Sequence, residues 1–192
     1  RCALHEDGFA LWKITPDWGE GEPNHELRVI DLVAATAAAH VALWHTLLSH
    51  DLVGPIRART CVSIDDPLPF LLTDPRALRT VAYTDMLWLC PFDVPALFSA
   101  RSYRVDDSLV VALVDGDLEP VERWRVSPSG SVRTDDAPDL RVTRGALGAL
   151  LLGGVTATEL AAGRRVVGDA ASLRRADVLF GWAPVAHCST SF

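Results

Sequence analysis

The chain has 192 residues, with 18 Lys or Arg against 25 Asp or Glu, so its formal net charge is −7. Apolar residues make up 49% and charged residues 22%, the proportions of a chain that buries a core, which excludes an intrinsically disordered tail. An acidic balance with scattered basic residues also excludes a nucleic-acid binder, because such a protein needs a basic stripe to neutralise phosphates.

The sequence opens with a hairpin pattern. Residues 2–5 and 9–14 flank the turn that ends in Gly8, and glycine adopts a positive φ without strain, so we expect two antiparallel strands. Residues 15–24 combine two prolines, two glycines and several acidic side chains. This composition predicts an exposed loop.

A strand and a helix follow the loop. Residues 25–33 alternate in polarity and predict a strand. One face of it would hold Leu27, Val29 and Asp31, and the other Arg28, Ile30 and Leu32. Thr36 is a suitable N-cap for a helix that ends at about His50. The apolar face of that helix would hold Val41, Trp44, Leu47 and Leu48, and a short strand is expected near 55–62.

Proline dominates the next segment. Residues 65–80 contain three prolines, which exclude a long helix and impose sharp corners. Residues 81–83 and 86–90 then predict two strands. Residues 94–100 predict a short helix, with Pro95 in its first turn.

The rest of the chain predicts strands first and helices afterwards. Residues 109–114 and 122–126 predict a hairpin, and residues 131–134 and 139–142 two further short strands. Expected helices cover 144–152, 156–162 and about 170–181, the last with Asp169 as its N-cap. Strands followed by helices, not alternating with them, indicate an α+β architecture, with a domain boundary near residues 80–84.

The cysteines and the apolar runs indicate the cellular compartment in which the protein resides. The cysteines at positions 2, 61, 90 and 188 form no CxxC pair, so we expect free thiols in a reducing cytoplasm. The most apolar runs, 33–48 and 145–155, are short and interrupted, so no membrane span is expected. The first residue is Arg1 and not Met, which indicates that residues ahead of it were removed or that the chain is a piece of a longer one.

Motif searches mainly exclude chemistry. His40, His45 and His50 are five residues apart, so each points about 140° from the last on a helix and no shared metal is expected. Neither GxxxxGK[ST] nor GxGxxG is present, so we expect no phosphate cradle. The acyl-CoA-binding pattern Arg/Gln-x-x-Gly-x-Gly/Ala is also absent, since Leu147 follows Arg144 at the third position. Glycines at 145, 148, 153 and 154 indicate close packing of a helix against a neighbour.

The end of the chain and the negative charge each leave two interpretations. An ordinary terminus is polar and frays, whereas Phe192 is apolar and suits a buried position. Its α-carboxylate could then accept a proton or pair with a cation, although residue types alone favour a packed, inert end. The charge of −7 is typical of a solvated surface, and the alternative is a cleft that concentrates a cationic small molecule.

Seven stretches, spread over almost the whole length, follow a pattern known from one enzyme family. They are DGFALWKI at 7–14, HELRVIDLVAAT at 25–36, ALWHTLLSHDL at 42–52, DDPLPFLLTDPRALRT at 65–80, the D-x-LWL run at 85–89, VPALFSARSY at 94–103 and ALGALLLGGV at 146–155. The proline-bearing segment and its spacing to DMLWL are the most specific part. With these stretches the chain resembles the C-terminal half of the Eis (enhanced intracellular survival) family of N-acetyltransferases.

The resemblance implies a fold and an activity. Residues 1–82 would be the C-terminal part of a second acetyltransferase-like (GNAT) domain, and residues 83–192 an α+β domain that resembles sterol carrier protein. The activity would be acetyl transfer from acetyl-CoA to amines of aminoglycosides or to lysine-like acceptors, by a cytoplasmic homo-hexamer without a metal. The family's cofactor motif belongs to its first domain, so acetyl-CoA would be bound by a region not present in this chain, which alone would be inactive.

The resemblance also assigns three residues. The family's C-terminal carboxylate acts as the catalytic base, a role that falls on Phe192. An acidic residue ahead of the L-W-L run lines the amine pocket, which points to Asp85. The penultimate residue, acidic in the best-known member, is Ser191 here, so one anionic contact is missing. The alternative is a non-enzymatic assembly or hydrophobic-ligand-binding module on the sterol-carrier-like fold.

Overall fold

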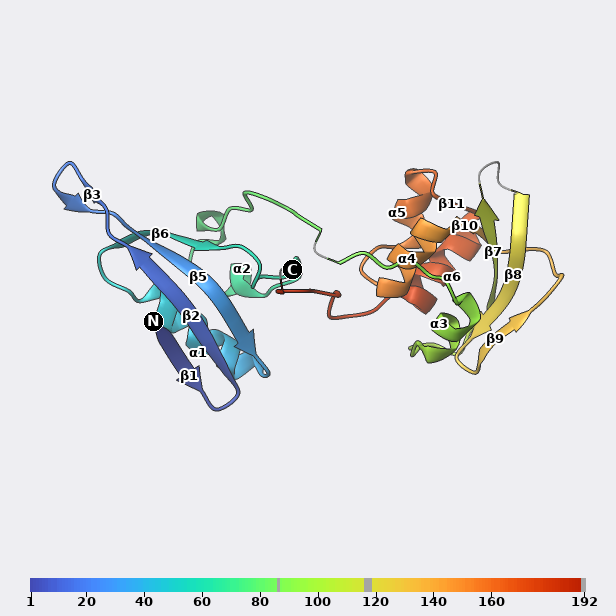
Figure 1. Cartoon of the computed structure of the whole chain (residues 1–192), viewed down its shortest axis with the longest axis horizontal. Helices are drawn as coiled ribbons and strands as arrows, with labels where there is room; N and C mark the ends of the chain where they lie inside the picture. Colours follow the sequence, from blue (N-terminus) through green and yellow to red (C-terminus); the bar gives the residue numbers. More distant parts are fainter. Residues whose placement is uncertain (86, 116–118, 191–192) are drawn as a thin grey trace. The chain divides into compact units, whose positions relative to one another are not determined.

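The computed structural model describes residues 1–85, 87–115 and 119–190 (Figure 1). The chain divides into two compact units. The first unit comprises Arg1–Met86 together with His187–Phe192, and the second comprises Leu87–Ala186. Each unit has its own sheet, its own helices and its own hydrophobic core.

The first unit is a four-stranded sheet in the order β1-β2-β5-β6. Its strands are β1 (Cys2–His5), β2 (Gly8–Thr15), β5 (His25–Ala34) and β6 (Val53–Ala58). The predicted hairpin of β1 and β2 is confirmed, while β6 runs parallel to β5 after a helical crossover. The expected loop at 15–24 includes a minimal hairpin of β3 (Trp18–Gly19) and β4 (Glu22–Pro23).

A β-bulge changes which residues of β5 face the core. Leu11 of β2 pairs with Asp31 and Trp12 pairs with Val29, so Ile30 is an extra residue in the ladder. The extra residue shifts the inward-facing set by one position. Leu32 is therefore buried with Leu27 and Val29, and the prediction that placed it on the opposite face with Arg28 and Ile30 was wrong.

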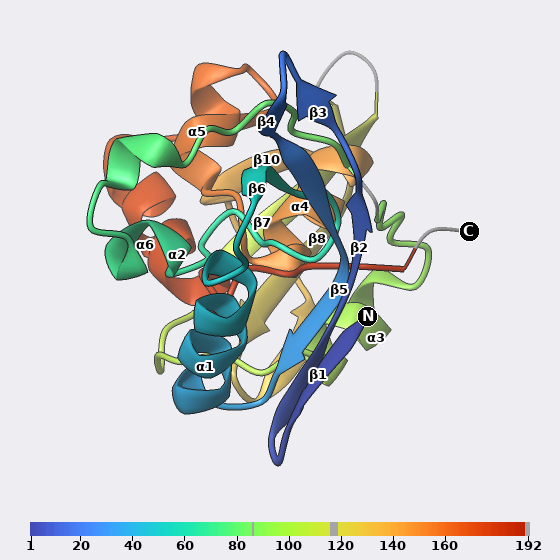
Figure 2. The ribbon, with the colours of Figure 1, turned by 90° about the vertical axis from the view of Figure 1, so that its left-hand side faces the viewer.

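Helix α1 (Ala37–Leu48) packs on one face of this sheet, as Figure 2 shows. The predicted N-cap is confirmed, because the Thr36 hydroxyl accepts the Ala39 N–H at 3.2 Å. The buried stripe comprises Ala39, Leu43, Trp44 and Leu47. Val41 and Leu48 lie just outside that stripe and are nearly half exposed, so the predicted apolar face was right for two of its four residues.

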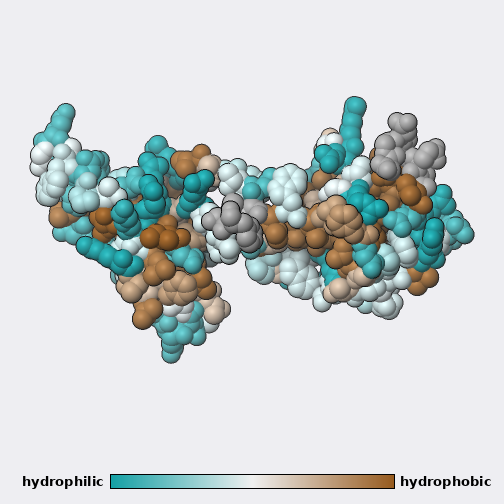
Figure 3. Space-filling view, viewed as in Figure 1, coloured by the Kyte–Doolittle hydropathy of each residue, from teal (hydrophilic) through white to brown (hydrophobic). Residues whose placement is uncertain are grey.

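The opposite face of the sheet carries exposed apolar side chains. Leu4, Leu11 and Ile30 are 83, 37 and 56% exposed, and Figure 3 shows apolar patches over these strands. The buried face, in contrast, packs Ala10, Trp12, Leu27 and Val29 against the stripe of α1. Among the described residues, the first unit is therefore a two-layer structure with a helix on one face of the sheet and exposed apolar side chains on the other.

The proline-rich segment forms only short helices, as its sequence predicts. These are α2 (Leu68–Leu71) and the single 3₁₀ turn η1 (Pro75–Ala77). The strands predicted at 81–83 and 86–90 are wrong for the described residues 81–83 and 87–90, which belong to no strand and pair with no strand of the described structure. Strand-forming residue types need a partner strand to form a ladder, and this segment has none in the described structure.

The second unit is a five-stranded sheet in the order β11-β10-β7-β8-β9. Its strands are β7 (Leu109–Asp115), β8 (Glu119–Ser127), β9 (Gly130–Arg133), β10 (Leu140–Thr143) and β11 (Val166–Gly168). The predicted β7–β8 hairpin is confirmed, and β10 joins the other side of β7 in parallel. The three-residue β11 was not predicted from the sequence, because so short an edge strand shows no periodicity.

Four helices complete the second unit: α3 (Val94–Ala100), α4 (Arg144–Leu152), α5 (Ala157–Ala162) and α6 (Ala170–Phe180). Their predicted limits are confirmed to within one residue. Capping side chains account for this agreement, since Asp93, Thr143, Thr156 and Asp169 each accept an N–H of the first turn. Among the described residues there is no helix long and apolar enough to cross a membrane.

Candidate functional site

The structure places one of the three predicted site residues. Asp85 is exposed and lies directly ahead of residues 87–91. Ser191 and Phe192 lie outside the described residues, at the end of the C-terminal tail, residues 181–192. Two segments flank these residues: the 87–91 segment follows Asp85, and the tail leads to Ser191 and Phe192.

The 87–91 segment lies tightly against helix α4. A Cβ atom at Gly148 would overlap the carbonyl oxygen of Leu89 and would lie 3.5 Å from Cδ of Pro91. Arg144 donates a hydrogen bond from Nη1 to the Pro91 carbonyl at 2.5 Å. The backbone that follows Asp85 is thus fixed to α4 by a glycine and an arginine, without strand pairing.

The tail lies against the C-terminal end of the same helix. A Cβ atom at Gly153, where φ is 77°, would lie 2.6 Å from Cβ of Trp182, and one at Gly154 would lie 2.8 Å from Cγ1 of Val185. The Trp182 N–H donates to the Gly153 carbonyl at 3.2 Å. The prediction that glycines here allow close packing is confirmed at Gly148, Gly153 and Gly154, which we call the α4 glycines.

Arg101 joins the ends of two helices where the tail begins. Its guanidinium donates to the carbonyls of Leu151, Leu179 and Phe180 at 3.0, 3.4 and 2.5 Å. These carbonyls belong to the last turns of α4 and α6. Carbonyls there have no hydrogen-bond partner within their own helix, and they carry the negative end of the helix dipole. Burial lowers the pKa of this guanidinium, and the electrostatic influence of Tyr103 opposes that shift.

Two aromatic rings support the same arginine. The Arg101 guanidinium lies 5.4 Å from the ring centroid of Tyr103 and 5.6 Å from that of Phe180. The Tyr103 hydroxyl donates to the Phe98 carbonyl at 3.0 Å, and burial raises the pKa of this phenol to about 12. The ring also contacts that of Phe180, with the centroids 6.2 Å apart, so Tyr103 contributes to the packing around Arg101.

Arg104 contacts the tail itself. Its Nη2 donates to the Ala183 carbonyl at 2.6 Å, and its guanidinium lies 4.7 Å from the ring centroid of Trp182. Sequence reasoning missed the contacts of Arg101 and Arg104, because their partners are backbone carbonyls 50 to 79 residues away, and no spacing pattern reports such contacts. Arg101 lies in the VPALFSARSY stretch and Arg104 directly follows it, but the stretch does not indicate their partners.

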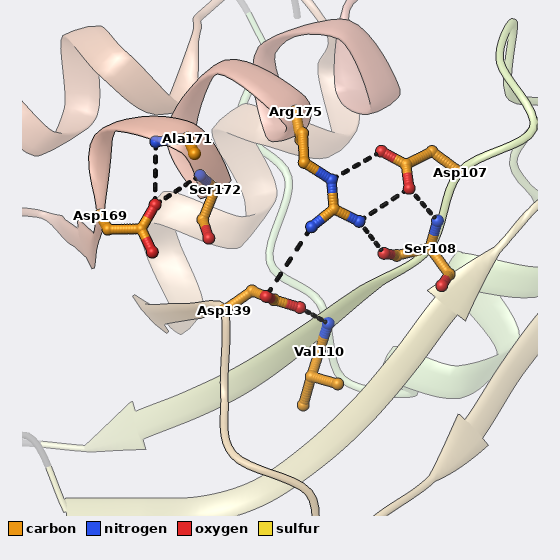
Figure 4. A network of polar contacts seen from close by, with 8 residues as sticks. All are labelled: Asp107, Ser108, Val110, Asp139, Asp169, Ala171, Ser172 and Arg175. Atoms are coloured by element: carbon orange, nitrogen blue, oxygen red, sulfur yellow. Dashed lines mark hydrogen bonds and ion pairs between the residues drawn. The ribbon is translucent and has the colours of Figure 1, made fainter.

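The second unit contains a further polar network, shown in Figure 4. Arg175 donates from Nε and Nη2 to the two carboxylate oxygens of Asp107 at 2.9 and 2.7 Å, and from Nη2 to the Ser108 carbonyl at 2.6 Å. Asp139 lies 3.9 Å from Nη1 of Arg175 and accepts the Val110 N–H. These groups pair with one another and connect α6 to the residues just ahead of β7 and β10, so the network stabilises the fold of the second unit.

The helix histidines have separate partners in the first unit. Nε2 of His40 lies 3.2 Å from the Asp66 carboxylate and accepts the indole N–H of Trp44 at 3.2 Å. Nδ1 of His50 lies 2.9 Å from the Thr46 carbonyl. No group of three or more potential metal ligands occurs in the part of the chain that the structure describes.

Cys61 is buried in the same unit. Burial raises its pKa to about 11, so the group is a neutral thiol at physiological pH. A thiolate is the reactive form of cysteine, so Cys61 does not serve as a nucleophile there.

Comparison with known families divides the chain in two. Residues 1–89 match the acetyltransferase (GNAT) domain, and residues 94–189 match the sterol carrier protein domain. Both matches agree with the mixed α/β folds of the two units.

Individual relatives extend over nearly the whole chain. N-acetyltransferase Eis of Mycobacterium tuberculosis is 37% identical over 185 residues, which cover 92% of this chain and 43% of that protein. An uncharacterized N-acetyltransferase of Streptomyces avermitilis is 36% identical over 165 residues, which cover 83% of this chain and 39% of that protein. The chain therefore spans less than half the length of these relatives.

A solved structure agrees with the sequence comparison. Eis1 from Mycobacterium abscessus superimposes with a TM-score of 0.88 at 34% identity, covering 98% of this chain and 49% of that protein. A GCN5-related N-acetyltransferase from Kribbella flavida superimposes with a TM-score of 0.63 at 25% identity. By both sequence and fold, the chain belongs to the Eis family of N-acetyltransferases and joins a GNAT-type segment to a sterol carrier protein domain.

Proposed function

We propose that this chain is the C-terminal portion of an acetyl-CoA-dependent N-acetyltransferase that acetylates amines. Residues 1–82 would complete the second acetyltransferase-like domain, and residues 83–192 would form the sterol-carrier-like domain. The observation that carries the proposal is the placement of two segments on α4. The segment that follows Asp85 and the tail that leads to Phe192 are both fixed to this helix by the α4 glycines.

The proposed chemistry uses two carboxylates of this chain. An amine must lose a proton before it attacks the thioester of acetyl-CoA; the attack forms the C–N bond and breaks the C–S bond, and CoA leaves as a thiolate that takes up a proton. Asp85, exposed and anionic, would bind the ammonium form, and the α-carboxylate of Phe192 would accept the proton. Ser191 would contribute a neutral hydroxyl to the substrate pocket. Acetyl-CoA would be supplied by a region outside this chain.

The acceptors that suit this arrangement are cationic amines, either aminoglycosides or protein lysines. A net charge of −7 favours the approach of such substrates. We also propose a cytoplasmic homo-hexamer. All four cysteines lie in the part of the chain that the structure describes, and all are free thiols, which agrees with a reducing compartment.

The alternative, a hydrophobic-ligand-binding module, would need an apolar cavity in the second unit. The core there is occupied by its own side chains, among them Phe98, Phe180, Leu147 and Leu150, all buried. A depression of about 440 Å³, lined by residues that include Val105, Arg174 and Val178, opens beside α6. An open surface depression does not enclose a lipid, so the enzymatic proposal has the stronger support.

Activity assays on two proteins test the proposal. The 192-residue chain alone should bind no acetyl-CoA and transfer no acetyl group to an aminoglycoside or a lysine peptide. The protein encoded by the complete reading frame should do both. Robust transfer by the 192-residue chain alone would show that the division of roles is wrong.

A further inference from the structure

The outer face of the first sheet, which lies opposite helix α1, carries two rows of apolar side chains. Residues paired directly across neighbouring strands point to the same face. Leu4 pairs with Phe9 and Phe9 with Val33, which makes one row across β1, β2 and β5. Cys2 pairs with Leu11 in a second row. A sheet face in water usually carries polar side chains, so these rows indicate a face that another element covers.

A third row on the same face is cationic. Lys13 pairs with Arg28, and Arg28 with Arg57. Both arginines bond to Glu26, at 3.0 and 2.9 Å. The Lys13 ammonium has no hydrogen bond or ion pair with any described residue, and a like charge lies opposite it. Asp31, half-buried in the second row, is the other acidic residue here. The element that covers this face should therefore bring an anion to Lys13.

The dimensions of the three rows match those of one helix. Neighbouring strands lie about 4.8 Å apart, so three strands span about 10 Å, which is the width of an α-helix with its side chains. Along β2, the distance from Phe9 to Lys13 is about 14 Å, which a helix covers in about nine residues. The chain spans less than half the length of its relatives, so a complete protein of that length could supply such a helix.

We propose that a helix from the part of the complete protein outside this chain packs on the outer face of the first sheet. Its apolar stripe covers the two apolar rows, and one of its carboxylates pairs with Lys13. This inference rests on the proposed function, in which the chain is one portion of a longer enzyme. A second copy of the chain is the competing occupant, and the experiments separate the two.

Two native side chains report whether the face is covered. Cys2 is exposed, and Lys13 is exposed and the only lysine of the 192 residues. A thiol reagent and reductive methylation should modify them at least about tenfold more slowly in the protein encoded by the complete reading frame than in the 192-residue chain, because a covered group reacts only during transient opening. Mass spectrometry of the labelled peptides measures the rates.

Two outcomes of the labelling would contradict the proposal. Equal rates in the two proteins would show that nothing outside the chain covers the face. Protection that is lost when either protein is diluted would assign the face to a second copy and overturn the docked helix.

Reversing the charge of Lys13 tests the carboxylate. In the 192-residue chain, Lys13→Glu places an anion opposite Arg28 and should leave Tm unchanged or raise it. In the complete protein the new anion would face the carboxylate of the helix, so Tm should fall by about 2 °C or more. Lys13→Arg keeps the charge and should leave Tm unchanged in both. The same response of both proteins to Lys13→Glu would overturn the contact.

Ile30 tests the apolar contact, because it is 56% exposed on the outer side of β5. Ile30→Asp should leave Tm of the 192-residue chain nearly unchanged and lower Tm of the complete protein by several degrees, since the carboxylate would be buried there. Val41→Asp is the matched control, because Val41 is 46% exposed but lies on α1. It should change both Tm values equally. Equal losses from Ile30→Asp in the two proteins would overturn the apolar contact.

Acetyl transfer, measured on the same preparations, keeps this inference separate from the proposed function. An active complete protein in which Cys2 and Lys13 react as fast as in the 192-residue chain would overturn the docked helix and leave the function standing. An inactive complete protein in which both are protected would overturn the function and leave the docked helix standing.

Discussion

At the scale of single residues, arginines that bind backbone carbonyls organise the second unit. Arg101 satisfies the last carbonyls of two helices, Arg104 holds the tail, and Arg144 holds the 87–91 segment. A guanidinium has five donors in a rigid plane, so one side chain can satisfy several carbonyls at once. Contacts of this kind join segments that are distant in sequence.

The Asp107–Arg175 pair should make stability depend on pH in the acidic range. Hydrogen bonding from Arg175 holds the pKa of Asp107 below its ordinary value of 3.8. The stabilisation is therefore complete above pH 3.8 and is lost as the pH falls through the lower pKa of the folded state. Asp107→Asn should lower the free energy of unfolding by less than about 1 kcal/mol at pH 7, because the pair is partly exposed.

Urea unfolding at several pH values measures this effect. The difference in free energy of unfolding between the parent and Asp107→Asn should shrink below pH 3.8 and stay constant from pH 5 to 8. A difference that grows on acidification would contradict the assignment of the ion pair.

Thiol reactivity should rank the cysteines by burial. Cys61 is buried with its pKa raised to about 11, whereas Cys2 is exposed. A thiol-specific reagent at pH 7.5 should therefore label Cys2 quickly and Cys61 only after the first unit unfolds. Mass spectrometry of the labelled peptides measures both rates, with the Cys61→Ser variant to identify the slow phase. Equal rates in the folded protein would exclude the described burial.

At the scale of elements, the sequence predicted what local chemistry decides. Four helices of the second unit were located correctly because polar side chains cap their first turns. The β1–β2 hairpin was located correctly, but Gly8 does not adopt the expected positive φ; its lack of a Cβ instead makes room for the Val33 carbonyl oxygen, which would lie 2.3 Å from such an atom. The bulge at Ile30 was not predictable, since it depends on the register between β2 and β5. The segment 81–90 has strand-forming residues but no partner strand, which only tertiary structure shows.

The candidate site was predictable to a smaller extent. Resemblance to a family supplied Asp85, Ser191 and Phe192, and the glycine pattern supplied the close packing at α4. The contacts of Arg144 with residue 91 and of Arg104 with residue 183 could not be predicted from nearby residues, because every residue type has a backbone carbonyl that can accept such a bond.

Gly148 and Gly145, both in helix α4, should differ sharply in their tolerance of alanine. Gly148→Ala would place a methyl group onto the Leu89 carbonyl and should lower the free energy of unfolding of the second unit by about 1–3 kcal/mol. Gly145→Ala is the matched control in the same helix, because its Cβ would lie 3.6 Å from the nearest atom, Nη2 of Arg165. It should be neutral or stabilising by up to about 1 kcal/mol. Denaturant titration compares the two, and equal effects would argue against the described contact.

At the scale of the whole molecule, the chain has two hydrophobic cores that share no residue. One contains Leu47 and Trp44, and the other contains Leu147 and Phe180. Each core closes on its own sheet, which makes each unit a candidate for independent folding.

Paired core substitutions should therefore affect separate unfolding transitions. Leu47→Ala should lower the stability of the first unit, and Leu147→Ala that of the second, each by about 2–5 kcal/mol, because both side chains are fully buried. Differential scanning calorimetry should show that each substitution shifts a different transition. A single transition shifted equally by both substitutions would show that the two cores unfold as one.

The spacing of the α4 glycines sets a geometric requirement on the helix. Gly148 lies within α4, and Gly153 is the C-cap that follows its last residue, Leu152. Because each helical residue rises about 1.5 Å along the axis, the 87–91 segment and the tail meet α4 at different heights. Inserting or deleting one apolar residue between these glycines would keep the composition of the helix, yet it would turn one contact by about 100° relative to the other. The number of residues in the helix between these contacts, and not its hydrophobicity, therefore determines how the two segments are arranged.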